Sequence, residues 1–438
     1  MGSIPIVSAV SQIYGCDNEI NEKRYQEFMN KFKSLYNQDP EFIVRAPGRV
    51  NIIGEHIDYC GMPVLPMAIE PDILVAVTRR NDNTIQVNNE NSGAYKPFTF
   101  THTQGETVEI DTSNHFWGNY FKCGYRGAYE ATNEPAVRGM NCLLGGNLPT
   151  GSGLSSSSAL VCCSAMTFSL VNDTKLTQSE IVECAVKAER YVGVNGGGMD
   201  QTCSIMAKNS SALFIEFHPK TAVTDVKFPK TDPQIAFVIA NTLVTSNKKD
   251  TAPVCYNLRV VETRIAALML AKHLQIQDFM NIANPLTMKI VMDMHLNEDA
   301  EIKQCGETEV WCRKLGKMVD ISKAFFGKNQ GGFTWEQCAE YLGMTVEELK
   351  IKVQTDRFPV IAESLQLYNR TLHVYSEALR VVKFRQICEN GGDNNGPTIQ
   401  RLGELMNESQ ESCDGLFNCS CEELNTLCGI ARYVVNDC

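Results

Sequence analysis

The sequence predicts an α+β protein whose two halves differ in their secondary structure. Residues 41 to about 240 carry short runs of β-branched and aromatic residues, separated by segments with helical spacing. From Val254 to about Glu411 the apolar spacing is mostly helical. A loop rich in glycine and serine separates a β-like run, Met140–Leu144, from a helix-forming run, Ala159–Met166. Because a linker is rarely found between two strongly patterned elements, we interpret this loop as part of a site.

The individual elements follow from the same two periodicities. The first forty residues are expected to form a polar, helical lead-in. The expected strands are Phe42–Val44, Ile73–Val77, Thr84–Val87, Met140–Leu144, Ala212–Glu216 and Ile235–Ala240. The expected helices are His115–Ala131, the helix after the glycine and serine loop, Gln178–Tyr191, a short helix from Met199, Arg259–Ala271 and Val374–Val382. A capping box at Thr345–Glu348 is expected to start another helix, and Glu389–Gly396 reads as an exposed loop.

The composition describes an ordinary globular chain. Its 438 residues leave room for about two or three domains. The formal net charge of −11 and the lack of a block rich in Lys and Arg argue against binding to nucleic acid or to a membrane. The 18 cysteines show no disulfide or metal-ligand spacing, and the start of the chain lacks a signal pattern. We therefore expect a cytoplasmic protein with reduced thiols.

The loop within Gly145–Leu160 has the properties of an anion cradle. Its position between a strand and a helix aims several unpaired backbone N–H groups and the positive end of the helix at one point. The glycines allow close approach of the backbone, and the serine hydroxyls can bond phosphate oxygens or a metal ion. The pattern is not a Walker motif, because no Gly-Lys-Ser/Thr closes the loop.

Two further clusters carry charged groups beside glycines. Arg45–Asp58 gathers arginines and hydrogen-bonding acidic and imidazole groups around a Gly/Pro turn, and these groups could bind a polyol. A surface turn with solvated charges is the alternative. Gly196–Gln201 places Asp200 at the start of a helix, where a carboxylate is favourable by itself. Near a phosphate site, Asp200 becomes a candidate base for a hydroxyl nucleophile.

Together these stretches resemble the GHMP family of sugar kinases, and within it the galactokinases and N-acetylgalactosamine kinases. Arg45–Tyr59 resembles the galactokinase signature nearly residue for residue, and Pro149–Ala159 matches the ATP-binding second motif of the family. Gly196–Gln201 matches the segment that holds its catalytic Asp. The resemblance implies a two-domain GHMP kinase fold. After a lead-in over residues 1–40, it implies an N-terminal domain like ribosomal protein S5 domain 2 over residues 41–240. A ferredoxin-like α+β C-terminal domain with helical insertions is implied over residues 241–438, with its last part missing.

The resemblance also implies roles for individual residues. Asp200 would take the proton of the anomeric hydroxyl of the sugar, while Arg49 would keep Asp200 ionised and stabilise the transferred phosphoryl group. The implied sugar-binding residues are Arg49, Glu55, His56, Asp58, Gly197, Asp200 and Tyr256. The implied ATP-binding residues are Trp117, Tyr120, Gly151, Ser152, Gly153, Leu154, Ser155, Ser156 and Ser157, with Ser157 as the Mg²⁺ ligand. Trp117 and Tyr120 are alternatively aromatic residues of the core.

One motif of the family has no match. Its members carry a third glycine-rich run of the type Thr-Gly-Ala-Gly-x-Gly-Gly, and the sequence stops at Tyr433–Cys438, where the approach to that run should begin. We therefore expect a truncated product with uncovered strand edges and apolar surface, of doubtful stability and activity.

Three functions remain open at this point. The leading hypothesis is ATP-dependent phosphorylation of N-acetylgalactosamine at its anomeric (C1) hydroxyl, favoured by His56–Gly61, Gly196–Gln201 and Cys419–Cys421. The second is a galactokinase, and the third is a non-catalytic protein that senses sugar and ATP. In each case the expected partners are a small-molecule sugar and ATP with Mg²⁺, and the expected state is a monomer.

Overall fold

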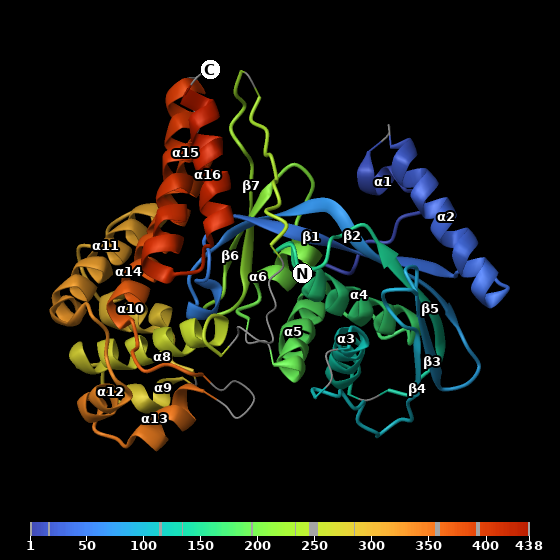
Figure 1. The fold of residues 1–438 in the computed structure, drawn as a ribbon, viewed down its shortest axis with the longest axis horizontal. Helices are drawn as coiled ribbons and strands as arrows, with labels where there is room; N and C mark the ends of the chain where they lie inside the picture. Colours follow the sequence, from blue (N-terminus) through green and yellow to red (C-terminus); the bar gives the residue numbers. More distant parts are fainter. Residues whose placement is uncertain are drawn as a thin grey trace. The chain divides into compact units, whose positions relative to one another are not determined.

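The structure is a computed structural model that describes residues 2–15, 18–113, 116–133, 135–193, 196–232, 234–244, 253–283, 285–354, 360–390 and 395–436. The chain forms two compact units (Figure 1). Unit 1 consists of Met1–Val50 and Ala68–Ala207, and unit 2 consists of Asn51–Met67 and Lys208–Cys438. The mixture of sheets and helices confirms the predicted α+β class. The domain boundaries expected after residues 40 and 240 stay a prediction.

A mixed five-stranded sheet in the order β1-β2-β5-β3-β4 forms the centre of unit 1, and the last residues of β1 and the first of β2 belong to unit 2. Its strands are β1 (Phe42–Ile53), β2 (Leu65–Arg79), β3 (Thr84–Asn89), β4 (Phe98–Thr101) and β5 (Met140–Gly146). β5 pairs antiparallel with β2 and parallel with β3. Each strand expected here is therefore present, and β1 and β2 are longer than the short apolar runs that predicted them.

Helices cover both faces of this sheet, and the side chains of β2 show why. Val75 and Val77 point into a core formed with α3 (Gly118–Ala131), α4 (Ser156–Val171) and α5 (Gln178–Glu189). The alternate residues Leu74 and Ala76 pack against α2 (Glu19–Tyr36) on the opposite face. Because successive strand residues face opposite sides, an unbroken apolar run is what a strand covered on both faces requires. Figure 1 shows α3, α4 and α5 on one side of the sheet and α2 on the other.

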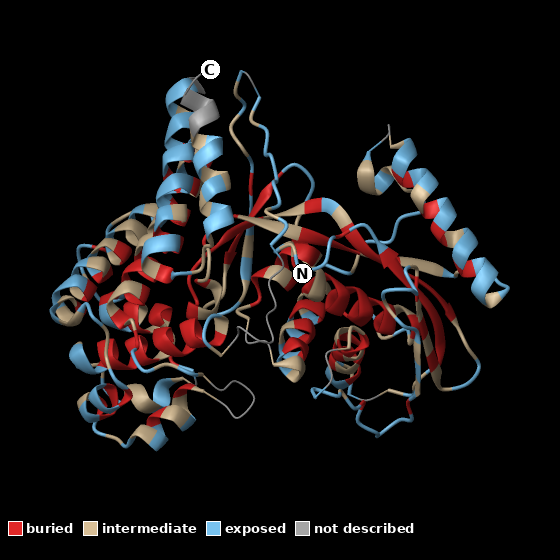
Figure 2. Cartoon of the chain, viewed as in Figure 1, coloured by how far each residue is buried: buried red, intermediate tan, exposed pale blue. Residues whose placement is uncertain are grey.

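The helix after the glycine and serine loop is buried on all sides. Thirteen of the sixteen residues of α4 are buried, which explains why its sequence is apolar without a polar stripe. The remaining helices of unit 1 are α1 (Ser11–Tyr14), η2 (Arg190–Val192) and α6 (Met199–Met206). Figure 2 shows the buried residues gathered along the strands and α4.

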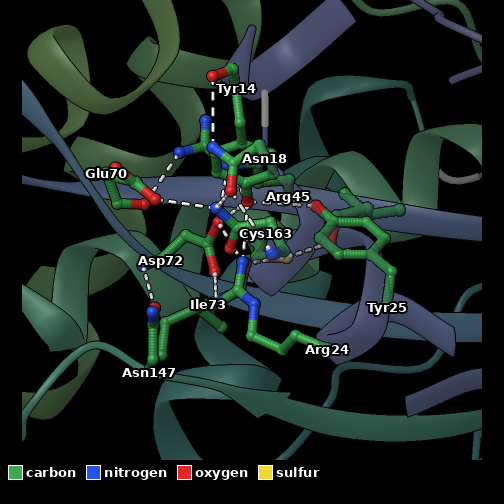
Figure 3. A network of polar contacts seen from close by, with 12 residues as sticks. Tyr14, Asn18, Arg24, Tyr25, Arg45, Glu70, Asp72, Ile73, Asn147 and Cys163 are labelled. Carbon is green, nitrogen blue, oxygen red and sulfur yellow. Dashed lines mark hydrogen bonds and ion pairs between the residues drawn. The ribbon is translucent and has the colours of Figure 1, made fainter. Parts of the chain in front are cut away.

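A buried carboxylate connects the helical lead-in to the start of the glycine and serine loop (Figure 3). Asp72 is fully buried and accepts hydrogen bonds from Tyr14, from Arg24 Nη1 at 3.0 Å and from Arg45 Nε at 2.6 Å. Its main chain bonds the loop: Asp72 N donates to Asn147 Oδ1 at 3.0 Å, and Asp72 O accepts from Asn147 N at 3.1 Å. The lead-in is thus a structural part of unit 1, because it supplies two of the groups that balance the Asp72 charge.

Unit 2 combines a β-hairpin with a helical assembly. Its elements are η1 (Asp58–Cys60), β6 (Ala212–Glu216), β7 (Ala222–Val226), α8 (Tyr256–His273), α9 (Phe279–Ile282), α10 (Met288–Leu296), α11 (Glu307–Phe326), η3 (Gly327–Asn329), α12 (Trp335–Leu342), α13 (Val346–Val353), α14 (Leu367–Asn390), α15 (Asn395–Ser412), the π-helical turn η4 (Cys413–Phe417) and α16 (Glu422–Asn436). α14 packs against α8 and α11, and both α8 and α14 are largely buried. The capping box predicted at Thr345–Glu348 is confirmed as the start of α13.

Three expected elements differ from the structure or lie partly outside it. The strand expected at Ile235–Ala240 is wrong: the structure describes this whole segment and assigns it no strand, and Val238 and Ile239 are exposed. A β-rich run forms a strand only where a neighbour accepts its hydrogen bonds, and none does so here among the described residues. α3 begins at Gly118, and His115 lies outside the described residues, as do residues 391–394 of the expected loop Glu389–Gly396. Within the described ranges, each helix is too short or too polar to cross a lipid bilayer.

Candidate active site

The glycine and serine loop of unit 1 adopts the conformation that an anion cradle needs. Gly151 and Gly153 have φ values of 70° and 75°, a left-handed conformation that glycine adopts without cost. α4 begins directly after the loop, and no side chain caps its N-terminus. The first N–H groups of a 16-residue helix therefore lack an intrahelical partner and face the loop.

Ser155, the residue before α4, combines two unfavourable features. It is left-handed with a φ of 62°, a conformation that costs a residue with a side chain roughly 1–3 kcal/mol. Its Oγ is buried without a hydrogen-bond partner among the described residues. Strained backbone and an unpaired buried hydroxyl typically occur together where a ligand supplies the missing partner. The predicted ATP residue Ser155 is therefore the position of the loop where the structure points most directly to a ligand.

An ion pair lies beside this loop. Arg49 on β1 donates from Nε to Asp200 Oδ1 at 2.6 Å, and its Nη1 donates to Gly153 O at 2.8 Å. The Arg49 and Asp200 side chains are 14% and 23% exposed, so the pair is accessible to a small molecule and only partly screened by water. Asp200 occupies the first turn of α6, whose positive end favours a carboxylate. The two residues predicted to be catalytic therefore contact each other, and Arg49 also contacts the loop.

A glycine in β1 permits this close approach. A side chain at Gly48 would come within 2.5 Å of Leu148 Cδ1 and 2.8 Å of Leu154 O. Arg49 N also donates to Leu154 O at 3.2 Å, so the strand and the loop are joined by their main chains. The glycine between the two arginines of the signature is thus required by packing.

Glu189 is a buried carboxylate of this region that the sequence analysis missed. It is 4% exposed and accepts bonds from Ser158 Oγ at 2.9 and 3.0 Å and from the Gln201 side-chain amide. Ser158 follows Ser157 on α4, and Gln201 follows Asp200 on α6. The network therefore connects the helix of the serine loop to the helix of the candidate base. A glutamate near the end of a predicted helix was the available signal, but its partners are distant in sequence.

The predicted sugar-binding residues of unit 2 include a cluster of rings and polar groups. His56 is left-handed with a φ of 58°, and its Nδ1 lies 3.2 Å from the hydroxyl of Tyr59. The ring of Tyr256 lies 5.5 Å from that of His56 and 5.9 Å from that of Tyr59. Phe417 completes the cluster at 5.5 Å from His56. The structure thus brings the predicted residues His56 and Tyr256 together, and it adds Tyr59 and Phe417.

Glu55 and Asp58 lie on either side of His56 along the chain. Glu55 follows the end of β1, and Asp58 opens η1. Burial raises the pKa of Tyr59 well above its usual value, with the charge of Asp58 contributing. The Tyr59 phenol is therefore a neutral hydrogen-bonding group at physiological pH. Rings with neutral polar tips beside carboxylates are typical of sites that bind a polyol through both its apolar and hydroxyl faces.

The two aromatic residues predicted for the nucleotide base lie at the edge of the unit 1 core. Trp117 Nε1 donates to Lys96 O at 3.1 Å, and its ring packs 5.1 Å from that of Phe98. Tyr120 is partly buried, which raises its pKa to about 12, with Glu189 contributing. Both side chains contact the core, so their role with a nucleotide stays a prediction. Gly197 is half-buried next to α6, and its role likewise stays a prediction.

Comparisons with known proteins identify the relatives of this chain. The family model described as the galactokinase galactose-binding signature matches residues 30–79, and that of the GHMP kinases N terminal domain matches residues 119–208. Galactokinase of Dictyostelium discoideum is 38% identical over 98% of this chain and 83% of its own length. Galactokinase of Candida parapsilosis is 39% identical over 95% of this chain and 82% of its own length. The crystal structure of Lactococcus lactis galactokinase complexed with galactose covers 93% of this chain and 84% of its own, with a TM-score of 0.60 and 20% identity.

The fold and the family matches define a sugar kinase of the GHMP class, and the fold expectation is confirmed by the structural match. The extent and identity of the matches show more than the class. The chain belongs to the galactokinase family.

Proposed function

We propose that this protein transfers the γ-phosphoryl group of ATP to the anomeric hydroxyl of galactose, giving galactose 1-phosphate and ADP. The observation that carries the proposal is the Arg49–Asp200 ion pair, with its 2.8 Å bond from Arg49 to Gly153 of the serine loop. This arrangement puts a candidate base, a guanidinium and a phosphate cradle within a single unit of the molecule. These are the parts that phosphoryl transfer to a hydroxyl needs.

The proposed chemistry assigns one step to each group. Asp200 accepts the proton of the anomeric hydroxyl as its oxygen forms a bond to the γ-phosphorus, and the bond to the oxygen that leaves with ADP breaks. Arg49 holds Asp200 by its 2.6 Å bond and supplies positive charge next to the transferred group. The uncapped N–H groups of α4 and the Ser155 hydroxyl receive the phosphate oxygens. Glu55, His56, Asp58 and Tyr256 of unit 2 bind the sugar.

The residues present fit a magnesium ion bound together with ATP. Mg²⁺ prefers oxygen ligands and is usually held by one or two carboxylates in addition to substrate phosphates. The Ser157 hydroxyl is the predicted ligand, and the Glu189 carboxylate, bonded to the adjacent Ser158, is a second candidate. When bound, the ion would neutralise charge on the phosphates.

The choice of sugar is the finer part of the proposal. The names of the Dictyostelium and Candida relatives favour galactose over N-acetylgalactosamine, which was the leading hypothesis from the sequence. Discrimination between these sugars depends on a pocket for one acetamido group, and a site built to hydrogen-bond that group rejects the sugar lacking it strongly. The preference for N-acetylgalactosamine therefore becomes the alternative that the experiment must exclude.

A kinetic comparison of sugars tests the proposal. Steady-state rates are measured with ATP and Mg²⁺ on galactose, N-acetylgalactosamine and glucose, and ³¹P NMR identifies the phosphorylated position of the product. We expect the highest kcat/KM with galactose and an anomeric phosphate. A higher kcat/KM with N-acetylgalactosamine would overturn the choice of sugar but keep the kinase. Binding of galactose without turnover would instead support the non-catalytic sensor.

A further inference from the structure

Residues on one face of a helix in unit 2 contact the loop that carries the predicted sugar-binding residues. His373, Glu377 and Val381 are four residues apart on α14, so they share one face of the helix. Each of them contacts Gly54 or Glu55, which follow β1 and are more than 300 positions earlier in the sequence. All of these residues belong to unit 2.

The main chain of Glu55 is held at both of its polar groups. Glu377 Oε1 accepts from Glu55 N at 3.3 Å and from Gly54 N at 2.8 Å. His373 Nε2 lies 2.9 Å from Glu55 O, and since a carbonyl can only accept, this nitrogen donates. The two side chains therefore fix the peptide groups on both sides of the Glu55 Cα, which sets the direction in which the Glu55 side chain leaves the backbone.

Close packing at Gly54 adds a third contact between α14 and the loop. Gly54 has a φ of 112°, and a Cβ there would lie 3.1 Å from Val381 Cγ2 and 3.0 Å from Val64 Cα. α14 therefore packs directly against the backbone of the loop at Gly54. This contact also helps to position the next residues along the loop. His56, whose ring meets Tyr256, follows directly.

The buried carboxylate of Glu377 is kept ionised by its neighbours, which strengthens its hydrogen bonds to the loop amides. The carboxylate is fully buried, and besides the two loop amides it accepts from Ser409 Oγ at 2.6 Å and from Arg380 Nε at 2.8 Å. Burial by itself would raise the pKa of Glu377, but Arg380, His373 and Ser409 outweigh it and lower the pKa below the usual value. Hydrogen bonds to an ionised acceptor are about twice as strong as neutral ones. A neutral side chain of the same shape would hold the loop amides less firmly.

The imidazole is similarly fixed on its far side. His373 Nδ1 lies 2.8 Å from Ser412 Oγ, and the ring of Phe417 packs at 4.3 Å. With Nε2 donating to Glu55 O, the neutral ring accepts at Nδ1 from the serine hydroxyl. Phe417 in turn contacts the ring of His56, so the same group that supports His373 also borders the predicted sugar site.

We propose that Glu377 and His373 are positioning residues for sugar binding: together they hold the Gly54–Glu55 backbone so that the side chains of Glu55 and His56 meet the sugar hydroxyls. The inference deepens the proposed function and rests on it for the identity of the ligand, galactose. Neither residue is placed in contact with substrate or with the reacting atoms.

The kinetic test uses substitutions that keep the shape of each side chain. Glu377→Gln should raise KM for galactose by about tenfold, because a charged acceptor is replaced by a neutral one, while KM for ATP stays unchanged. His373→Phe keeps the ring against Phe417 but loses the donor and should have the same effect. His373→Gln can still present an N–H to Glu55 O and should recover most of the affinity. Glu389→Gln, on the exposed end of the same helix, removes a surface carboxylate and is the matched control.

Hydrogen exchange of the apo protein gives a readout that does not depend on catalysis. The amides of Gly54 and Glu55 should be protected in the wild type and should exchange at least about tenfold faster in Glu377→Gln, with the amides of β6 unchanged. If the wild type fails to phosphorylate galactose, the proposed function is overturned, and the exchange result still decides whether α14 positions the loop.

Three results would overturn the inference. The first is a folded Glu377→Gln protein with unchanged KM for galactose and unchanged protection at residues 54–55. The second is an equal rise of KM for galactose and for ATP with faster exchange throughout, which would indicate a structural role only. If Glu377→Gln does not fold, the His373 pair decides: equal kinetics for the Phe and Gln variants would be the third.

Discussion

A buried acidic residue contacts each of two loops: the glycine and serine loop of unit 1 (the serine loop) and the loop of unit 2 that begins at Gly54 and carries the predicted sugar-binding residues (the sugar loop). The two acidic residues hold their loops differently. Asp72 bonds the serine loop through its main chain and uses its side chain to bind Tyr14, Arg24 and Arg45. Glu377 bonds the sugar loop with the carboxylate itself. The charge of Asp72 therefore stabilises the surroundings of its loop, whereas the charge of Glu377 acts on the loop directly.

The comparison separates two ways in which a fold prepares a site. In unit 1 the candidate reacting group, Asp200, is paired with Arg49 and partly exposed, whereas the buried Asp72 bonds Asn147 at the start of the loop. In unit 2 a buried charge, Glu377, is in direct contact with the backbone of Gly54 and Glu55, which precede His56 of the ring cluster. Substitutions in the two regions should consequently divide into losses of rate, losses of stability and losses of sugar affinity.

The largest effect should come from the candidate base. Asp200→Asn keeps the shape of the side chain and a bond to Arg49 but removes the proton acceptor, so kcat should fall about 10²- to 10⁴-fold. Steady-state kinetics with ATP and galactose measure this loss, and thermal unfolding checks that the fold is kept. Asp173→Asn is the matched control, because Asp173 is also paired with arginines but lies on the surface. Full activity of the Asp200→Asn enzyme would remove Asp200 from the mechanism.

The Asp72 network should affect stability more than chemistry. Asp72→Asn leaves Arg24 and Arg45 without their partner, which should lower the free energy of unfolding by about 3 kcal/mol. This value is at the lower end of the range for breaking a buried ion pair, because the two arginine side chains are still 20% and 21% exposed. Urea unfolding measures the change. Since the main-chain bonds to Asn147 remain, kcat of the folded variant should change less than threefold, or about 0.7 kcal/mol.

A surface pair provides the comparison for this variant. Asp82→Asn breaks a bond to Arg80 on an exposed carboxylate and should change the unfolding free energy much less than Asp72→Asn does, because water screens the surface pair. If Asp72→Asn kept its stability and lost its rate instead, Asp72 would belong with the reacting groups, and the contrast between the two loops would disappear.

The sequence alone predicted the elements and residues that depend on neighbouring positions. The strand, loop and helix around Gly151 and Gly153 follow from local composition, as does the capping box of α13. Glu189, Glu377 and Phe417 could not be assigned in this way, because their partners are 12 to more than 300 residues away. The expected strand at Ile235–Ala240 was wrong for the related reason that a strand needs a neighbour that its own sequence does not specify.

The imidazole behind the sugar loop should make the stability of the protein depend on pH. Burial lowers the pKa of His373 from 6.5 to about 4, with Arg380 and Arg370 adding to this and Glu377 and the Glu55 carbonyl opposing it. The unfolded chain therefore takes up a proton near pH 6.5, while the folded protein does so only near pH 4. The contribution of the neutral His373 to the free energy of unfolding is fully present above pH 6.5, and about 3 kcal/mol of it is lost as the pH drops to 4.

Urea unfolding between pH 7.5 and 5 measures this dependence. His373→Gln removes the titrating group while keeping a donor for Glu55 O, so its unfolding midpoint should fall less steeply with decreasing pH than that of the wild type. Over this range the carboxylates of the protein contribute equally to both proteins. Parallel pH profiles would show that folding does not lower the pKa of His373, and the buried, neutral imidazole that donates to Glu55 O below pH 6.5 would then have to be abandoned.

The smallest effect is expected from two serine substitutions on α4, of which one should lower only the stability and the other both the stability and kcat. Ser158→Ala removes a hydroxyl that bonds Glu189 at 2.9 Å, and a bond to a charged group contributes about 1.5–3 kcal/mol to stability. Ser164→Ala, in the third turn of the same buried helix, removes a bond of 2.6 Å to Phe121 O and should cost about 1 kcal/mol. Only Ser158→Ala should also lower kcat, by about threefold to tenfold, because Glu189 joins α4 to the helix of Asp200 through Gln201. Chemical unfolding and steady-state kinetics of the two variants test this difference, since equal rates at unequal stabilities would reduce the Glu189 network to a contribution to folding alone.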